Sequence, residues 1–245
     1  MRLTVVIPTY NEAENLPRLV SALFALPLAE LSLLVVDDNS PDGSGALADE
    51  LARAHPGCMQ VLHRAGKLGL GTAYVAGFQA ALDQGAEAVA QMDADFSHDP
   101  AKLVELAAAL VGVDLAIGSR YVPGGRLDER WPLWRRGLSA WGNIYARTIL
   151  RLPVRDCTAG FRLWRASALR ALPLERVRSN GYAFQVEMAF LAHRLGLRHT
   201  EIPIYFADRR WGTSKMSFRI QREAAVRVWQ LPFEYRDLRP LPAHR

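Results

Sequence analysis

Short apolar runs recur through the first half of the chain, and between them apolar residues return every three or four positions. The runs occupy residues 3–7, 31–36, 59–63, 88–92 and 114–118. Helical spacing follows them from Asn11, which we take as a helix cap, and at residues 44–54, 71–84 and 99–110. This alternation predicts an α/β fold with a mostly parallel sheet and helices on both faces.

The alternation is less regular after residue 120. Residues 121–131 have a loop composition, 138–150 and 180–195 have helical spacing, and 201–206 suit a strand. A basic amphipathic stretch follows from about residue 217 to 231, and it suits either a bilayer surface or packing against the domain. We therefore divide the chain into an α/β domain at residues 1–215 and an amphipathic C-terminal extension at residues 216–245.

Composition is ordinary for a soluble globular protein, with 50% hydrophobic and 22% charged residues among 245. The first apolar run is too short for a signal peptide, and none approaches the roughly 20 residues that span a bilayer. Cys58 and Cys157 lie far apart, which is typical of incidental thiols in a reduced cytosolic protein.

The net charge of +5 conceals an asymmetry between the two halves of the sequence. Residues 1–118 carry a balance of −9 and residues 119–245 a balance of +14. An acidic half suits a metal site, and a basic half suits phosphates or anionic surfaces. An arginine-rich genome would explain part of the excess, but not its concentration in one half.

Polar clusters follow four of the predicted strands, where ligands of parallel α/β sheets bind. They comprise residues 8–12, Asp37-Asp38, Asp93-Ala94-Asp95 and residues 118–120. An Asp-x-Asp pair alone is weak evidence, because acidic pairs are common in turns. Its position after a buried strand favours a hard divalent cation that also binds substrate phosphates.

The glycine-rich segment at residues 66–71 matches neither of the common nucleotide-binding loops. It lacks the Gly-Lys-Ser/Thr ending of a P-loop, and its spacing differs from the dinucleotide fingerprint. The first strand is not followed by glycines either. A nicotinamide oxidoreductase and a P-loop kinase are therefore poor interpretations.

Longer motifs resemble the inverting glycosyltransferases of family 2, which have the GT-A fold. They are Val6-Ile7-Pro8-Thr9-Tyr10-Asn11-Glu12, Val35-Val36-Asp37-Asp38-Asn39-Ser40-Pro41-Asp42-Gly43 and Gly66-Lys67-Leu68-Gly69-Leu70-Gly71. Residues 92–100, 118–121, 156–162 and 208–215 look like the dolichol-phosphate (polyprenol monophosphate) mannosyltransferase branch. The resemblance covers about residues 3–218, and its later motifs are the more specific.

The resemblance implies a site for a nucleotide-sugar donor and a divalent metal, Mg²⁺ or Mn²⁺. The donor would contact Pro8, Tyr10, Glu12, Asp37, Asp38, Lys67, Asp93, Ala94, Asp95, Arg209 and Lys215. The metal would be held by Asp93 and Asp95. Some family members have Gln at the position of Ser97, and that side chain can join the metal shell. Ser97 is shorter, which suits contact with the metal through a bridging water.

The same resemblance implies a polyprenyl phosphate as acceptor. Its phosphate would be bound by Arg120, Arg135 and Ser139, and the chemistry would depend on Asp95, Arg120, Arg209 and Lys215. A phosphate monoester has its second pKa near ~6, so its oxygen needs little or no general base. We expect in-line attack with inversion, and we interpret His98 and His193 as capping or packing residues.

Three hypotheses remain at this stage. The first is transfer of mannose from GDP-mannose to a polyprenyl phosphate; the second is transfer of glucose from UDP-glucose; the third is a non-catalytic membrane-associated module. Tryptophans and arginines between residues 126 and 141 favour a peripheral protein at the cytoplasmic face of a membrane, alone or with a separate anchoring protein. We expect no nucleic-acid partner, because no such module is recognisable.

Overall fold

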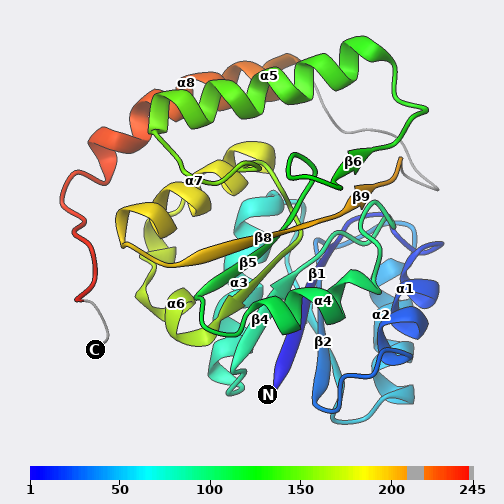
Figure 1. Cartoon of the computed structure of the whole chain (residues 1–245). Coiled ribbons are helices and arrows are strands. Elements are labelled where there is room, and N and C mark those ends of the chain that lie inside the picture. Colours follow the sequence, from blue (N-terminus) through cyan, green and yellow to red (C-terminus); the bar gives the residue numbers. More distant parts are fainter. Residues whose placement is uncertain (209–217, 243–245) are drawn as a thin grey trace.

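A seven-stranded mixed sheet forms the centre of the molecule in the computed structural model, which describes residues 1–208 and 218–242 (Figure 1). Its strands are β1 (Leu3–Thr9), β2 (Leu31–Asp37), β3 (Met59–His63), β4 (Ala88–Gln91), β5 (Leu115–Ser119), β7 (Arg162–Arg165) and β8 (His199–Pro203). Their order across the sheet is β3-β2-β1-β4-β7-β5-β8. Two short strands, β6 (Arg126–Leu127) and β9 (Tyr205–Phe206), pair separately.

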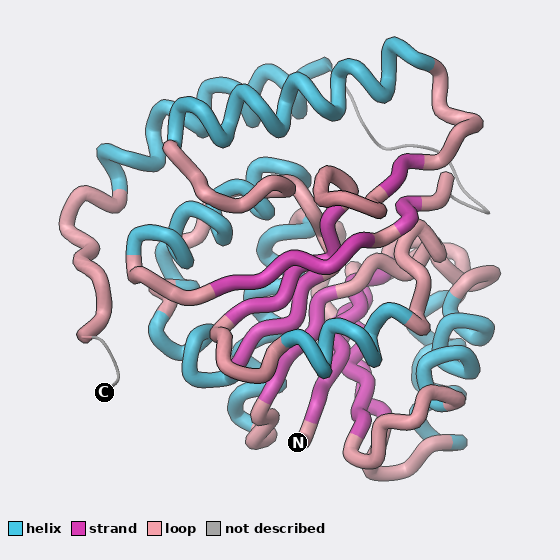
Figure 2. The backbone as a smooth tube through the Cα atoms, in the orientation of Figure 1, coloured by secondary structure: helices cyan, strands magenta, loops and turns pink. Residues whose placement is uncertain are grey.

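Helices cover both faces of this sheet, as Figure 2 shows. They are α1 (Leu16–Phe24), α2 (Ser44–Ala54), α3 (Leu70–Asp83), α4 (Lys102–Ala109), α5 (Leu133–Leu150), α6 (Ala166–Ala171), α7 (Gly181–Arg194) and α8 (Phe218–Glu234), with a 3₁₀ turn at Leu174–Arg176. The predicted α/β class, with a mostly parallel sheet and helices on both faces, is confirmed.

Two hydrophobic cores lie on opposite faces of the sheet, because its strands are apolar on both sides. One core packs α1, α2 and α4 against the side chains of Val5 and Ile7. The other packs α3, α5, α6, α7 and α8 against Val6 and Val36. At Gly77 an added Cβ would lie 2.3 Å from Val6 Cγ1, so glycine lets α3 approach β1 closely.

Strand β7 was not among the predicted elements. It runs antiparallel between β4 and β5, with Arg162 opposite both Gln91 and Ile117. Its sequence, Arg-Leu-Trp-Arg, has charged ends and does not form an apolar run. The guanidinium of Arg162 is nevertheless fully buried and donates from Nη2 to the carbonyl oxygen of Cys157 (2.8 Å).

Several predicted boundaries were wrong. The first helix begins at Leu16, whereas Asn11 lies in a turn with φ 59° and its N–H donates to Ser40 Oγ. Helix α5 begins at residue 133, five residues before the predicted start, after Pro132. The predicted strand at residues 201–206 is two strands, separated at Ile204, and α6 was missed.

Helices α5 and α8 lie side by side in Figure 1 and form an outer layer over α7. Trp229 Nε1 donates to Tyr145 Oη (2.8 Å), which donates to the carbonyl oxygen of Ala225 (3.1 Å). The structure thus packs α8 onto the remainder of the chain. The division between residues 1–215 and 216–245 stays a prediction.

The buried carboxylate of Glu187 in α7 joins α8 to the rest of the fold. Its Oε1 accepts hydrogen bonds from Arg227 Nη2 (3.0 Å) and Tyr235 Oη (2.7 Å). Its Oε2 accepts from the backbone N–H of Ser179 (2.9 Å), immediately before α7. A buried charge needs such partners because burial otherwise costs several kcal/mol. One carboxylate therefore connects the outer layer to the loop before α7.

We expect Tyr235→Phe to lower the free energy of unfolding by about 1.5–3 kcal/mol, because a buried hydrogen bond to a charged group is lost. The control Asp237→Asn breaks the exposed pair with Arg176 in the same region and should cost less than about 1 kcal/mol. Urea unfolding followed by circular dichroism measures both. Equal losses in the two variants would contradict the importance of Glu187.

Candidate active site

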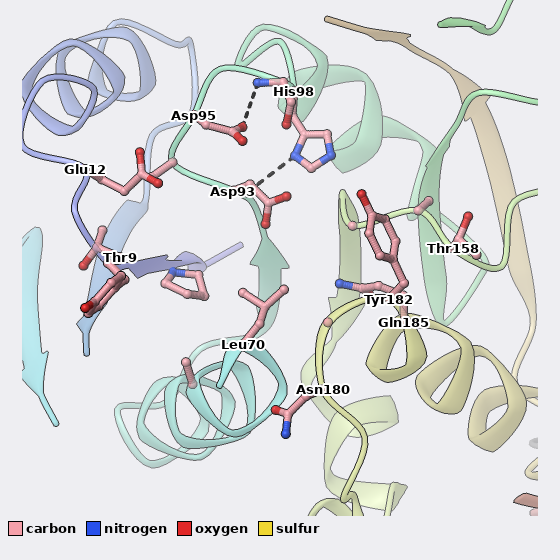
Figure 3. A pocket seen from close by; sticks show the side chains of 18 of the residues that line it. Thr9, Glu12, Leu70, Asp93, Asp95, His98, Thr158, Asn180, Tyr182 and Gln185 are labelled. Atoms are coloured by element: carbon pink, nitrogen blue, oxygen red, sulfur yellow. Dashed lines mark hydrogen bonds between the residues drawn. The ribbon is translucent and has the colours of Figure 1, made fainter. Parts of the chain in front are cut away.

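A cavity of about 330 Å³ opens at the carboxyl ends of β1, β2 and β4 and extends to the start of α7 (Figure 3). Turns that leave the parallel strands form one wall, and residues 158–160 and 180–185 form the opposite one. The cavity brings together these predicted residues: Pro8, Tyr10, Glu12, Asp38, Lys67, Asp93, Ala94, Asp95, Ser97 and Arg120. Its position follows the rule for ligand sites in open α/β sheets.

One end of the cavity combines aromatic and charged groups. Lys67 Nζ lies 4.1 Å from the ring centroid of Tyr10, a cation–π contact. The carboxylate of Asp38 accepts a hydrogen bond from Arg64 Nη1 (2.6 Å), and both side chains are largely buried. Burial raises the pKa of Asp38, and Arg64 partly offsets this effect. Arg64, which the sequence reasoning missed, therefore positions Asp38.

Asp37 does not line the cavity but holds the turn after β2 in place. Its Oδ1 accepts hydrogen bonds from the hydroxyls of Thr9 (3.1 Å) and Ser40 (2.6 Å). Its Oδ2 accepts from the backbone N–H of Ser40 (3.1 Å). These bonds join the ends of β1 and β2, so Asp37 supports the turn behind the cavity and is not among the residues that line it.

The turn after β4 presents Asp93 and Asp95 to the cavity. Phe96 takes the left-handed conformation, with φ 59°, which is uncommon for a bulky residue and typical of functional sites. The N–H of Ser97 donates to Asp95 Oδ1 (3.0 Å), and Tyr74 Oη donates to Asp93 Oδ1 (3.0 Å). Asp93 is thus held by Tyr74 of α3, and Asp95 is held by the backbone of its own turn.

The chemistry of this turn suits a divalent cation. Ser97 Oγ is buried without a hydrogen-bond partner among the described residues, beside the carboxylate of Asp95. No group of three or more Asp, Glu, His or Cys that could bind a metal occurs in the described parts of the chain. Two carboxylates with a nearby hydroxyl leave places for phosphate oxygens and water, an arrangement common for Mg²⁺.

The buried ring of His98 packs against the turn that carries Asp93 and Asp95. Its ring stacks on Phe161 at 5.2 Å between centroids, and its Nδ1 accepts a long hydrogen bond from the N–H of Asp93 (3.5 Å; dashed in Figure 3). Burial lowers the pKa of His98, although Asp93 and Asp95 act in the opposite direction. The ring is therefore neutral at neutral pH and packs under the turn.

Arg120 reaches the cavity from the end of β5 and is locked by a buried ion pair. Its Nε and Nη2 donate to the two carboxylate oxygens of Asp156 (2.8 and 2.7 Å), and Nη2 also donates to Thr158 Oγ1 (2.6 Å). Burial alone would lower the pKa of Arg120, but the Asp156 carboxylate outweighs it and raises that pKa. Arg120 is therefore a permanent cation with a fixed orientation.

A second, mostly apolar cavity of about 150 Å³ lies between α5, α7 and α8. Thr158 and Tyr182 line both cavities, so the two adjoin. The predicted acceptor residues Arg135 and Ser139 line this second cavity. Arg135 lies over the Trp131 ring (3.7 Å) and pairs with Asp208 (3.3 Å), whereas Ser139 Oγ bonds Tyr121 Oη (2.8 Å). The predicted acceptor residues thus divide between two adjoining cavities.

The structure accounts for the glycines that open α3 by packing. At Gly69, with φ 106°, an added Cβ would lie 2.4 Å from Asn180 Oδ1. At Gly71 it would lie 2.2 Å from the carbonyl oxygen of Ser179. Glycine is therefore required where the loop before α7 crosses the start of α3.

Two predicted residues lie in a segment that the structure does not describe, and several residues that line the cavity were not predicted. Arg209 and Lys215, expected to contact the donor phosphates, fall in the segment 209–217 that the structure does not describe. The wall formed by Thr158, Asn180, Tyr182 and Gln185 was not predicted. Thr158 lies in the motif at residues 156–162, and the other three lie in the predicted helix at residues 180–195.

Comparison with known proteins agrees with this architecture. The family model described as Glycosyl transferase family 2 matches residues 4–172, so the chain belongs to this family of glycosyltransferases, as the motifs predicted. A glucosyl-3-phosphoglycerate synthase from Mycobacterium tuberculosis, solved with Mn²⁺, UDP-glucose and phosphoglyceric acid, has the same fold. It has a TM-score of 0.67 at 17% identity, covering 94% of this chain and 79% of its own.

Two curated relatives are much closer in sequence. The undecaprenyl-phosphate mannosyltransferase of Micrococcus luteus is 48% identical over 242 residues, which is 98% of each chain. The polyprenol monophosphomannose synthase of Mycolicibacterium smegmatis is 48% identical over 229 residues, 93% of this chain and 85% of the relative. Both names describe mannosyl transfer involving a polyprenol.

Acid is expected to destabilise the fold through His98. Just below its ordinary pKa of 6.5 the unfolded chain binds a proton that the buried ring does not. The free energy of unfolding should therefore fall with falling pH, by up to about 1.4 kcal/mol per unit from this group. In His98→Asn this contribution is absent. Urea unfolding at a series of pH values without added metal tests it, and parallel pH profiles for the two proteins would contradict it.

Proposed function

We propose that this chain transfers mannose from GDP-mannose to a polyprenyl phosphate, with inversion at the anomeric carbon. The observation that carries the proposal is the pair of adjoining cavities: one is lined by charged side chains, among them Asp93, Asp95 and Arg120, and the other is mostly apolar. A nucleotide sugar suits the first, and the start of a polyprenyl chain suits the second. The names of the two relatives at 48% identity support the same substrates.

The donor would lie along the strand ends, with its nucleoside near Tyr10, Asp38 and Lys67 and its diphosphate near Asp93 and Asp95. A divalent cation, Mg²⁺ or Mn²⁺, held by these aspartates with Ser97 beside them, would neutralise charge on the diphosphate. The proposed roles of Arg209 and Lys215 toward the donor phosphates rest on the sequence motif.

The acceptor phosphate would lie between Arg120 and the Arg135–Ser139 side of the second cavity. One of its oxygens would attack the anomeric carbon of the sugar, while the bond from that carbon to the donor phosphate breaks and the nucleoside diphosphate leaves. Arg120 supports this step, because its ion pair with Asp156 fixes its orientation before the acceptor arrives. A phosphate oxygen that is already anionic needs no base.

We further propose that the layer of α5 and α8 rests on a membrane surface. Strongly exposed apolar side chains gather there: Leu133, Trp134, Trp141, Ile144, Val226, Trp229 and Phe233. Tryptophan is typical of lipid–water interfaces. No described helix is both long and apolar enough to cross a bilayer. Peripheral attachment at the cytoplasmic face, alone or with an anchoring protein, would bring the second cavity to the lipid.

Transfer of glucose from UDP-glucose is the nearest rival, because the fold itself accommodates different sugar donors. The names of two relatives at 48% identity favour mannose. The deciding experiment follows radiolabelled sugar into a short polyprenyl phosphate, using GDP-mannose and UDP-glucose with and without a chelator. Product formed from UDP-glucose but not from GDP-mannose would overturn the assignment of the donor. Vesicle binding without any product would favour a non-catalytic module.

In the same assay, Asp95→Asn should reduce mannosyl transfer at least ~100-fold, since one charge that holds the cation and diphosphate is lost. Chelator should abolish the wild-type reaction, and Mn²⁺ or Mg²⁺ should restore it. Asp99→Asn is the matched control, because Asp99 is exposed and its carboxylate accepts a hydrogen bond only from the N–H of Ala101 among the described residues. Near-normal turnover by Asp95→Asn would refute the assignment.

Membrane contact makes a separate prediction. Replacing Leu133 and Trp134, which are 80% and 70% exposed, with serine should weaken binding to anionic vesicles by about tenfold. Val111→Ser is the control, because Val111 is equally exposed but follows α4. Vesicle sedimentation measures binding, and activity on a short acceptor in solution should persist. Unchanged sedimentation of the double variant would contradict the proposed surface.

A further inference from the structure

A chain of three buried side chains lies on the face of the sheet that α7 covers, and it ends at the cavity proposed for the donor. Trp164 Nε1 in β7 donates to Gln91 Oε1 in β4 (3.0 Å), and Gln91 Nε2 donates to Gln185 Oε1 in α7 (2.7 Å). Trp164 and Gln91 are fully buried, and Gln185 is 3% exposed. The chain thus connects the hydrophobic interior to a residue that lines the cavity.

The direction of these hydrogen bonds is determined by chemistry. A tryptophan N–H can only donate, so the side of Gln91 that faces it must be the carbonyl oxygen. The amide nitrogen of Gln91 then faces Gln185, which must present its own oxygen. An isolated glutamine amide has two interchangeable orientations, but here the tryptophan selects one of them. Gln185 is left with its Nε2, a donor, as the group turned to the cavity.

The position of this nitrogen is opposite the metal-binding turn. A Cβ added at Gly160 would lie 3.7 Å from Gln185 Nε2, 3.6 Å from Asp93 Oδ2 and 3.3 Å from the ring of His98. Gly160 therefore keeps open a space between a neutral donor and an acidic group. Figure 3 shows Gln185 and Asp93 approaching this space from opposite sides.

We propose that Gln185 binds the transferred sugar by donating a hydrogen bond from Nε2 to one of its oxygens, and that Trp164 and Gln91 fix the polarity of that contact. This inference rests on the proposed function and adds a sugar-binding residue to it. A hexose is uncharged and rich in oxygens, so a neutral donor of fixed direction can recognise it. Reversing the Gln185 amide would set two N–H groups against each other, leaving buried groups unpaired.

The test compares two ligands in the presence of Mn²⁺. Gln185→Met removes the donor at similar size, so GDP-mannose should bind about five- to tenfold more weakly. GDP, which lacks the sugar, should bind within about twofold of the wild-type affinity. Gln84→Met is the matched control, because it removes an exposed amide that bonds Gln60, and it should change neither affinity. Isothermal titration calorimetry measures all of these.

Trp164→Phe tests the polarity without altering any group that lines the cavity. Loss of the fixed donor lets the Gln91 and Gln185 amides reverse together, so GDP-mannose binding should weaken about twofold while GDP binding persists. A series of GDP-deoxymannoses identifies the oxygen: one of them should bind wild type more weakly than GDP-mannose does but show no further loss in Gln185→Met.

Retained GDP affinity also shows that each variant is folded. Equal weakening of GDP and GDP-mannose in Gln185→Met would overturn the inference, because the amide would then support the pocket and not the sugar. No weakening of either ligand would overturn it as well. If the wild-type chain binds neither GDP-mannose nor UDP-glucose, the proposed function fails instead, and the two failures are distinguishable.

Discussion

The antiparallel strand β7, inserted between β4 and β5, is the constraint on which the site depends. Because β7 starts where its two neighbours end, the loop that precedes it lies at the same sheet edge as Asp93 and Arg120. Asp156 in that loop accepts two hydrogen bonds from the Arg120 guanidinium. A fully parallel sheet would place this loop at the opposite edge, and the cavity would lose one wall.

The site has separate charged groups for two anionic substrates, a phosphate acceptor and a diphosphate donor. Acidic groups suited to a cation lie after β4, and the fixed Arg120 cation lies after β5. The two substrates would otherwise repel each other, because both carry negative charge. Holding Arg120 against Asp156 keeps the cation in place at the cost of an ion pair that must be fully satisfied.

The outer helices α5 and α8 connect the proposed membrane surface to the proposed donor site. Glu187 binds Arg227 and Tyr235 of the C-terminal region through one oxygen and the loop before Asn180 through the other. Asn180 and Tyr182 line the cavity proposed for the donor, and Tyr182 also lines the second cavity beside α5 and α8. The proposed membrane surface and the proposed donor site are therefore parts of one packed unit.

Local patterns were enough to predict the four strands from residue 3 to residue 92, the Asp-x-Asp turn and the family, because apolar runs and turn residues act over short distances. They could not predict β7, whose charged ends conceal a strand, or the exact start of α1. Nor could they identify Gln185, which lies far from its partner Gln91 in the chain. Only tertiary packing brings such residues together, since burial and hydrogen-bond direction depend on neighbours that are distant in sequence.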